Sequence, residues 1–447
     1  MRKILIIMST FAPYNSCGSI PNTKLVKYLA RQELDITLIA NSVSPGAPVD
    51  EKLLPAEMER IRTFRVQYSP LFTKTFGKAN TKLVQSGTKA KMKAERRPVR
   101  SLLVSLIKNV YYTARSHDWT RNAKRILRRE LRGEHFDVVY SSYPSTQTHT
   151  VARYAKRRGI AGAWVADFRD PMGYVAFDRF NYQKDIRKQH AFERKADHVT
   201  VVSEGALNKF RFPDVPDSKL SYFPNGYDPE DFSVSPETAG KGGELLRLFY
   251  AGSLYSGRRD LTVLFRAISE LAAEGAVDPA RIRVEYAGNE WDVLCGFAEK
   301  FGLTHICKNY GYVTRHQVME IMAQIDATLV CSHNTREDQG VVTGKLFELL
   351  LVEKPILTVV TGDLPDSELG RIVKDCEAGM VFEEATEARD YPLLKQWLKA
   401  IYEEKQRTGA VASTLSLAKR EQYSYQNIAD KLTALFEALA QPQDDKP

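Results

Sequence analysis

The sequence predicts an α/β protein made of two doubly wound parallel-sheet domains, each Rossmann-like. Continuous aliphatic runs such as Lys3–Met8 and Leu246–Ala251 alternate with amphipathic segments of helical period. This pattern is typical of parallel strands that are covered by helices on both faces. The alternation stops at midchain in a Gly-, Pro-, Ser- and Glu-rich stretch and then restarts. The length of 447 residues also exceeds what one hydrophobic core usually serves.

The first half of the chain carries six strand signals and two clear helix signals. Each strand signal is a short apolar run, and the helix signals have apolar residues three or four positions apart. The expected strands are 3–8, 35–40, 136–141, 162–167, 198–202 and 219–223, and the expected helices are 21–31 and 146–158. We assign residues 1–228 to an N-terminal domain on the acceptor side, with an insertion at about 73–132.

The second half repeats the pattern after a linker at 229–246. Its expected strands are 246–251, 281–287, 307–312, 327–331 and 355–360, with helices that begin at 261, 291, 315 and 345. We assign residues 247–420 to a C-terminal domain. A last amphipathic helix at 421–440 is expected to return to the N-terminal domain.

The positive charge of the chain is concentrated in the insertion. Residues 73–132 hold 17 Lys or Arg and three acids, so this segment carries about +14 against +9 for the whole chain. Such a block favours an anionic partner, either phospholipid headgroups or nucleic acid, although a solvated surface would look the same. The amphipathic stretch Val99–Tyr112 would lie at a membrane interface or pack on the domain.

Several classes of protein are disfavoured. The five cysteines are scattered, and neither cysteines nor histidines have metal-ligand spacing, so we expect no bound metal or other cofactor. There is no G-x-G-x-x-G, which argues against a dinucleotide oxidoreductase. The apolar run in Met1–Met8 is too short for a signal peptide, and no stretch is long enough to cross a bilayer. A cytoplasmic protein is expected.

The segment Gly340–Glu348, Gly-Val-Val-Thr-Gly-Lys-Leu-Phe-Glu, carries the most chemical information. It follows a strand and opens a helix, so Thr343 and Gly344 would present backbone amides and the positive end of a helix dipole to an anion. Lys345 adds a charge, and Glu348 one turn later could accept hydrogen bonds from two ribose hydroxyls. A nucleotide diphosphate fits this set. The alternative is a helix cap followed by an exposed ion pair.

A second anion site is suggested by Gly252–Arg259, directly after the first strand of the second half. Its glycines allow a tight loop close to a ligand, and Arg258 or Arg259 could neutralise a departing diphosphate. A solvated arginine pair is the alternative. Gly18, in the loop after strand 3–8, could donate a backbone amide to the same phosphates.

Two carboxylates and an arginine follow a strand in Trp164–Pro171. Loops at the carboxyl end of a strand face the ligand crevice, so Asp167, Arg169 and Asp170 are candidate catalytic residues that handle protons or sugar hydroxyls. The alternative is an Arg–Asp pair that only holds the loop in place.

At these residues the sequence resembles glycosyltransferase family 4, a group of GT-B enzymes. The resemblance is an ordered series of short segments that covers about residues 3–360. It comprises the Gly18 loop, Ser141-Ser142 with His149, Ala166–Pro171, Ala196–Ser203, Pro224–Gly226 with Asp228, Gly252–Arg259, Ala287-Gly288, Gly311, Thr343–Glu348 and Lys354-Pro355.

The resemblance implies a GT-B fold and a retaining transfer of a hexosyl or N-acetylhexosaminyl group from a nucleotide diphosphate sugar, without a bound metal. It implies that Arg258 and Lys345 bind the diphosphate and Glu348 the ribose, and that Gly18 approaches the phosphates. Gly311, Tyr312 and Val313 would lie near the base, and Arg169-Asp170 beside the transferred sugar.

Two positions depart from the family pattern. The family often has a glutamate that touches the donor sugar eight residues before the ribose glutamate, and this position is Gly340. The arginine that usually follows the glycine of the phosphate loop is Ser253.

The predicted function is a glycosyltransferase that acts on a glycan or lipid-linked acceptor in surface polysaccharide or lipopolysaccharide synthesis. Peripheral attachment to the inner face of the membrane is a second hypothesis. A nucleotide-sugar epimerase or hydrolase of the same build and a basic nucleic-acid-binding protein are the alternatives.

Overall fold

The computed structural model describes residues 1–16, 18–43, 47–75, 98–173, 179–232 and 243–441, and the side chains of 98–109 and 179–181 lie outside this description. The described residues form two compact units, which are treated separately below. Unit 1 comprises 1–202, 207–224 and the chain from Ile428 onward, and unit 2 comprises 203–206 and 225–427.

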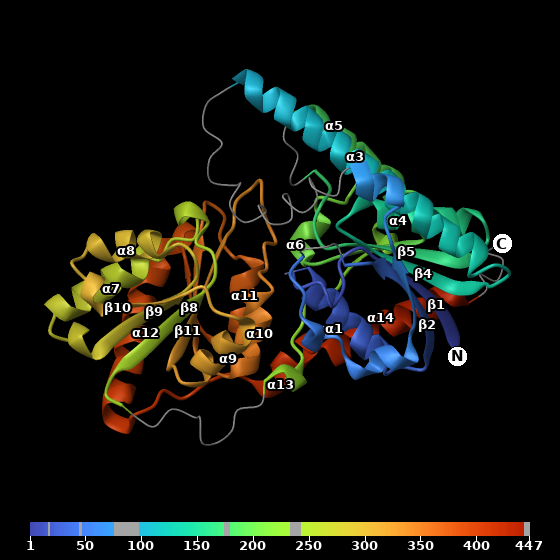
Figure 1. The fold of residues 1–447 in the computed structure, drawn as a ribbon. Helices are drawn as coiled ribbons and strands as arrows, with labels where there is room; N and C mark the ends of the chain where they lie inside the picture. The colour runs from blue at the N-terminus through green and yellow to red at the C-terminus, as the bar shows by residue number, and fades with distance from the viewer. Residues whose placement is uncertain (17, 44–46, 76–97, 174–178, 233–242, 442–447) are drawn as a thin grey trace. The chain divides into compact units, whose positions relative to one another are not determined.

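Unit 1 is built on a seven-stranded parallel sheet in the order β3-β2-β1-β4-β5-β6-β7 (Figure 1). Its strands are β1 (Arg2–Met8), β2 (Leu34–Asn41), β3 (Arg62–Val66), β4 (Phe136–Tyr143), β5 (Ala161–Phe168), β6 (His198–Val201) and β7 (Leu220–Tyr222). Its main helices are α1 (Ser19–Leu29), α3 (Pro98–Arg129), α4 (Thr146–Arg157), α5 (Arg179–Glu193) and α14 (Tyr425–Ala440).

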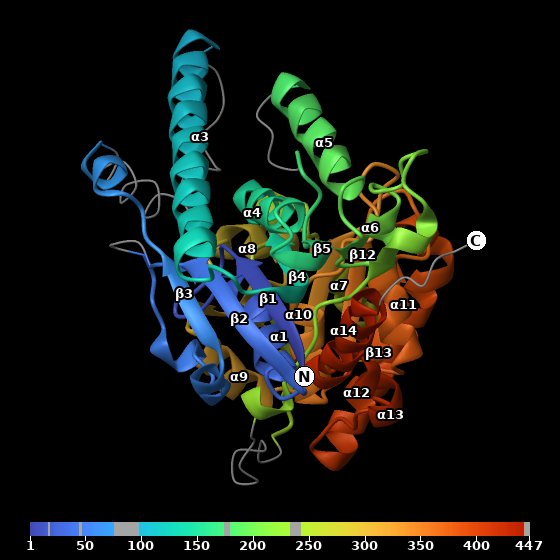
Figure 2. The same ribbon diagram turned by 90° about the vertical axis from the view of Figure 1, so that its right-hand side faces the viewer.

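Helices cover both faces of this sheet. Because successive residues of a strand face opposite sides, neighbouring residues of β4 show which helix covers which face. Ser141 bonds to His149 of α4, whereas the ring of Tyr140 packs edge-on against Phe436 of α14. Helices α3 and α5 extend on either side of α4 (Figure 2).

Unit 2 is built on a six-stranded parallel sheet in the order β10-β9-β8-β11-β12-β13. Its strands are β8 (Leu246–Ala251), β9 (Ile282–Ala287), β10 (Cys307–Gly311), β11 (Ala327–His333), β12 (Ile356–Thr361) and β13 (Gly379–Glu383). Its main helices are α7 (Thr262–Ala273), α8 (Trp291–Glu299), α9 (Arg315–Ala323), α10 (Lys345–Val352), α11 (Glu368–Asp375) and α12 (Glu387–Thr408).

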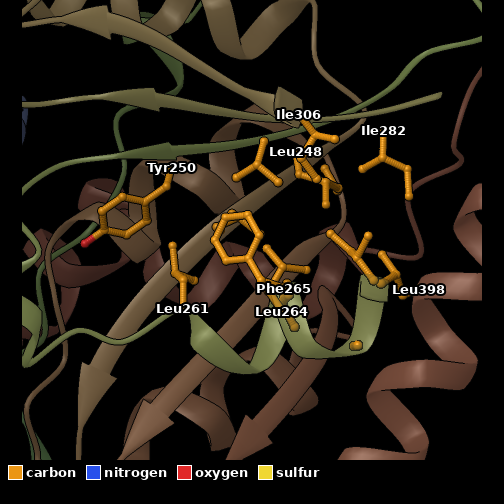
Figure 3. Packing of buried hydrophobic residues seen from close by; sticks show 14 of the residues in the cluster. Leu248, Tyr250, Leu261, Leu264, Phe265, Ile282, Ile306 and Leu398 are labelled. Atoms are coloured by element: carbon orange, nitrogen blue, oxygen red, sulfur yellow. The ribbon is translucent and has the colours of Figure 1, made fainter. Parts of the chain in front are cut away.

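The core of unit 2 shows why its aliphatic runs form strands. Leu248 and Tyr250 of β8 point to the same face and pack against Leu264 and Phe265 of α7 (Figure 3). All four side chains are at most 2% exposed. Each fully buried side chain of this size contributes about 1.5–3 kcal/mol through removal of apolar surface from water.

The predicted fold class is confirmed, since both sheets are parallel and covered by helices. Several elements were not predicted: β3, β13, α5, α11 and α12. The first helix also begins at Ser19, two residues before the expected start at Pro21. Proline is tolerated in the first turn of a helix because the amides there have no intrahelical partner, so Pro21 does not mark the boundary.

The predicted basic insertion and linker are only partly described. Residues 76–97 and 233–242, and the side chains of the apolar stretch from Leu102 to Ile107, lie outside the described residues. What is described of the insertion is largely α3, in which Val110 is exposed and Tyr111 and Trp119 are buried. In the described part of the chain, no helix combines the length and the apolar character that a membrane span requires.

Candidate functional site

Each sheet has a point where the strand order reverses, and such points form the ligand crevices of open α/β sheets. In unit 2 the reversal lies between β8 and β11, and in unit 1 between β1 and β4. In unit 2 the two segments leaving this point are Gly252–Arg259 after β8 and the loop after β11 that leads into α10. The strand order therefore brings the two predicted anion-binding segments of unit 2 to one edge of the sheet.

Lys345 joins these two segments. Its ammonium donates a hydrogen bond to the carbonyl of Ala251, the last residue of β8. Gly252 has φ +142°, which L side chains rarely adopt, and a Cβ there would lie 2.1 Å from the Lys345 Nζ, so a side chain at residue 252 would be strained and would displace the ammonium. Burial lowers the pKa of Lys345 to about 8, with Glu348 opposing the shift and Arg259 adding to it. A cation held at this cost is poised for an anionic ligand.

The start of α10 adds unpaired donors beside this lysine. Gly344 precedes the helix and has no side-chain cap, and the backbone amides of Gly344 and Lys345 donate to no described residue. Thr343 contributes its carbonyl to Leu346 and is half-buried. Orphan amides and the positive end of the helix dipole favour a phosphate at this position.

The two predicted arginines differ in their surroundings. Arg259 is half-buried and close enough to Lys345 to lower the lysine's pKa, and its guanidinium lies 4.6 Å from the ring centre of Tyr255. Arg258 is exposed, and its described hydrogen bonds involve its backbone, with its amide donating to Tyr255 and its carbonyl accepting from Thr361. Arg259 rather than Arg258 is therefore the arginine whose charge acts on Lys345.

The amides of the Gly252–Arg259 loop are occupied by a carboxylate of the chain itself. Glu290 accepts hydrogen bonds from the amides of Leu254 (2.6 Å), Tyr255 (3.1 Å) and Ser256 (2.7 Å), and from the hydroxyl of Ser253 (2.5 Å). These donors lower the pKa of Glu290 against the effect of its partial burial. The loop therefore offers a ligand its arginine side chain but not the amides of 254–256.

The predicted ribose ligand Glu348 is held by an arginine that the sequence did not single out. Arg315 of α9 lies 2.9 Å from a Glu348 carboxylate oxygen and 2.9 Å from an oxygen of Asp231. The two carboxylates raise the pKa of Arg315, outweighing its burial. Charge-assisted hydrogen bonds of this kind fix a side chain in one orientation. Arg315 follows Gly311 in the chain by four residues, and that proximity was the available signal.

The predicted base-side residues lie at the same edge of the sheet. Gly311 ends β10 with φ +68°. Its carbonyl accepts a hydrogen bond from the amide of Gly288, and the carbonyl of the neighbouring Ala287 accepts one from the amide of Gly252. Tyr312 is 81% exposed, and Val313 packs against the core. The structure thus aligns the ends of β8, β9 and β10, with the Tyr312 ring free to meet a ligand.

The departure at residue 340 has a structural reason. Gly340 has φ +70°, and a Cβ there would lie 2.7 Å from the backbone of Gly205 and Ala206. The hydroxyl of Ser203 also donates to the Gly340 carbonyl at 2.7 Å. Two backbones meet here, so a glutamate at 340 would have no room without a shift of the segment at 203–206.

In unit 1 the first predicted catalytic residue, Asp167, is fully paired. The sheet register aligns Ser142, Asp167 and Thr200 on adjacent strands, and both hydroxyls donate to the Asp167 carboxylate at 2.8 Å. Arg169 lies 3.6 Å from the same carboxylate and donates to the carbonyl of Phe223. Asp167 is 1% exposed, so its environment matches the alternative of a structural anchor.

Asp170 lies in a different environment from Asp167. Its side chain is exposed and accepts no hydrogen bond from a described residue. Desolvation nevertheless raises its pKa, while the guanidinium of Arg169 opposes the rise. Of the three predicted catalytic residues, Asp170 is the one available to accept or hold a proton.

His149 of the resemblance is buried rather than available for catalysis. Its Nδ1 lies 2.8 Å from the Ser141 hydroxyl, its ring packs 4.5 Å from that of Phe168, and burial lowers its pKa to about 3. The imidazole is therefore neutral at physiological pH and part of the core. Within the described ranges, no three His, Cys, Asp or Glu side chains gather as a metal ion would require.

A pocket of about 410 Å³ lies at the strand-order reversal of unit 1. It is lined mainly by hydroxyl and amide side chains from the ends of β1, β2 and β4 and from α3 and α4. The Oδ1 atom of Asn41 is buried there without a hydrogen-bond partner. Polar lining residues include Ser9, Thr10, Asn41, Arg115, Ser145 and Gln147. Gly18 lies near this edge, before α1, against the side chain of Thr10.

The architecture is that of the GT-B class, two Rossmann-like parallel-sheet units in one chain. Solved structures that match over nearly their whole length share it. A sucrose-phosphate synthase from Thermosynechococcus elongatus is 14% identical with a TM-score of 0.59, and the match covers 98% of this chain and 99% of that one. Alr3699/HepE of Anabaena, in complex with UDP, is 14% identical with a TM-score of 0.58, covering 98% and 100%. A glycosyltransferase from Rickettsia africae is 11% identical with a TM-score of 0.57, covering 99% of each.

A sequence profile for Glycosyltransferase Family 4 matches residues 81–231, about a third of the chain. The match includes the Asp167–Asp170 segment predicted to resemble this family. No curated protein matches the chain significantly. At these identities the structural likeness establishes the fold.

Proposed function

We propose that the protein is a glycosyltransferase that moves a sugar from a nucleotide diphosphate sugar to an acceptor. The observation that carries this proposal is the desolvated ammonium of Lys345, which lies against Gly252 at the strand-order reversal of unit 2, beside Arg259 and the uncapped start of α10. A diphosphate would satisfy both cations and the orphan amides together. The family profile and the UDP complex of the Anabaena structure support the same class of donor.

On the donor side, Arg259 and Lys345 bind the diphosphate, assisted by the amides of Gly344 and Lys345. Arg258, exposed one residue away, adds charge when the donor is bound. Glu348 binds the ribose with the carboxylate oxygen that Arg315 leaves free. Tyr312 and Val313 flank the base, and Gly18 of unit 1 approaches the phosphates.

Catalysis in this proposal is mainly electrostatic. The bond between the sugar and the diphosphate breaks with negative charge developing on the leaving oxygen, and fixed cations lower the barrier by stabilising that charge. Arg169 and Asp170 lie beside the transferred sugar, where Asp170 is the group that exchanges a proton with acceptor or sugar hydroxyls. Asp167 positions Arg169. The transfer retains the anomeric configuration, and the sugar is a hexosyl or N-acetylhexosaminyl group.

The acceptor binds in the 410 Å³ pocket of unit 1. Its hydroxyl and amide lining suits a glycan, and the unpartnered Oδ1 of Asn41 would accept a hydrogen bond from an acceptor hydroxyl. The acceptor is a membrane-linked glycan of surface polysaccharide synthesis, and the basic region around α3 keeps the enzyme at an anionic membrane face.

Replacing Lys345 with Ala is expected to lower kcat/KM for sugar transfer at least tenfold, because the developing charge on the diphosphate loses a cation. The measurement is radiolabelled sugar transfer from UDP-sugars to a lipid-linked glycan extract. Lys374→Ala, an exposed lysine of α11 in the same unit, is the matched control and should keep full activity.

Near-normal transfer by the Lys345 variant would remove this lysine from the site. Product analysis with donor alone separates the related enzyme classes. An epimerised or hydrolysed donor formed at the same rate without acceptor would contradict a transferase.

A further inference from the structure

A second group of cations lies in unit 1, on helices α3, α4 and α5, whose positions Figure 2 shows. Residues of these three helices line a pocket of about 640 Å³. Five of its nine lining residues are Lys or Arg and none is acidic. These cations are Lys124 of α3, Arg153, Arg157 and Arg158 of the α4 segment, and Lys188 of α5.

The cations of this pocket lie near one another and near an aromatic ring. Two of them make cation–π contacts with the ring of Tyr154, with the Lys124 ammonium 5.1 Å and the Arg158 guanidinium 5.7 Å from the ring centre. None of the five forms an ion pair with a described carboxylate. Burial lowers the pKa of Lys188, and Asp185, about one turn earlier on α5, opposes this shift. By contrast, Lys156 of the same helix α4 forms an ion pair with Asp197 at 2.9 Å.

This concentration of like charge has an electrostatic cost in the free protein. Burial lowers the pKa of Lys124, and repulsion from Arg128, Arg153 and Arg157 lowers it further. The hollow also continues along α5, where Lys184 and Arg187 line an adjoining pocket. A fold that gathers cations from three helices around a cavity, without acids to balance them, matches the requirements of a multiply charged anion.

We propose that this pocket binds a ligand with clustered phosphate groups, such as a phosphorylated headgroup or a soluble polyphosphorylated compound. Arginine guanidinium groups bind phosphate oxygens in pairs, and Arg153 and Arg157 lie one turn apart on α4, so they present two such forks to neighbouring phosphates. The pocket volume lies within the range of small-ligand sites. This site is separate from the diphosphate site proposed in unit 2 and does not depend on it.

The test uses tripolyphosphate as a soluble probe in titration calorimetry of the full-length protein. All variants carry Lys345→Met, so that the candidate diphosphate site of unit 2 does not account for the binding. We expect saturable binding that Arg153→Gln/Arg157→Gln weakens at least tenfold. The matched control is Arg121→Gln/Arg129→Gln, which removes the same charge from exposed positions of α3 outside the pocket and should change the Kd less than twofold.

A second arm identifies the source of the phosphate. Phosphatidylcholine vesicles with and without 20 mol% phosphatidic acid are floated with each variant (about a fifth anionic lipid, enough for a surface charge). If Arg153→Gln/Arg157→Gln loses vesicle binding and the control double variant does not, the result supports a lipid headgroup as the ligand. Unchanged vesicle binding together with weakened tripolyphosphate binding supports a soluble phosphorylated compound.

The proposal is overturned if tripolyphosphate does not bind saturably, or if the two charge-matched pairs weaken binding equally, because a general positive field would then explain it. Should the double variant fail to fold, the single Arg158→Gln replacement at an exposed position serves the same comparison. Retention of wild-type affinity by that variant would contradict the pocket.

Discussion

Asp167 in unit 1 and Lys345 in unit 2 are both charged groups near the carboxyl ends of parallel strands, but their environments are opposite. Asp167 receives two hydroxyl donors and a guanidinium, so its charge is balanced within the fold. Lys345 has one carbonyl acceptor, and burial and the neighbouring cation Arg259 lower its pKa while Glu348 opposes the shift. The comparison teaches that the fold balances two charged groups at sheet edges to very different extents, and the function proposed above rests on the less balanced of the two.

The largest expected difference between the two sites is in stability. Asp167→Ala should lower the free energy of unfolding by about 3–5 kcal/mol, because it leaves Arg169 and two buried hydroxyls without their shared partner. Lys345→Met should lower the free energy of unfolding by less than about 1 kcal/mol, or should raise it, because a desolvated charge is removed. Urea unfolding of both variants measures the difference. Equal losses of unfolding free energy in the two variants would contradict the view that Asp167 is balanced by the fold and Lys345 is not.

A pH titration of stability sharpens the same comparison. The pKa of Lys345 is about 8 in the folded chain and about 10.5 in the unfolded chain. Between these values the unfolded state binds more protons, so this group makes stability rise with pH, by up to about 3 kcal/mol. The unfolding free energy of wild type minus that of Lys345→Met should rise over pH 8–10.5 and be constant below pH 7. A constant difference over the whole range would show that Lys345 is not desolvated.

The smallest expected effect concerns Glu290, which accepts hydrogen bonds from the amides of the loop beside Lys345. Glu290→Gln keeps the shape but weakens four hydrogen bonds that now end on a carboxylate, and should cost about 1 kcal/mol of stability. With the function proposed above, KM for the donor should rise about fivefold while kcat changes little, because the loop and Arg259 lose their position. Asp292→Asn, exposed on α8, is the control. A fall in kcat with unchanged KM would contradict a positioning role.

The sequence predicted most of the strands and their parallel arrangement, because buried strands need continuous aliphatic runs. It did not reveal β3, Arg-Thr-Phe-Arg-Val, which lies at the sheet edge and has polar residues that break such a run. It also missed α12, in which Pro392 interrupts the helical pattern near the first turn. Edge strands and proline-containing helices lack the signals on which sequence patterns depend.

For the site, the sequence indicated which residues follow strand ends but not how their charges are balanced. The pairing of Asp167 depends on the register that aligns Ser142 and Thr200 beside it, and these residues are 25 and 33 positions away. Likewise nothing in the sequence of Gly252–Arg259 shows that Glu290 accepts hydrogen bonds from the backbone amides of this segment. Such partners come from non-local strand register, which a single sequence does not specify.

The chain returns to its first unit at the end, and this return has a consequence for biosynthesis. Residues of α14 such as Leu432 and Phe436 are at most 1% exposed, and Phe436 covers Tyr140 of β4. The ribosome makes this helix only after the whole of unit 2. Until α14 has been made, the sheet of unit 1 exposes an apolar strip, so unit 1 is begun before unit 2 but is completed after it and depends on protection from aggregation in the interval.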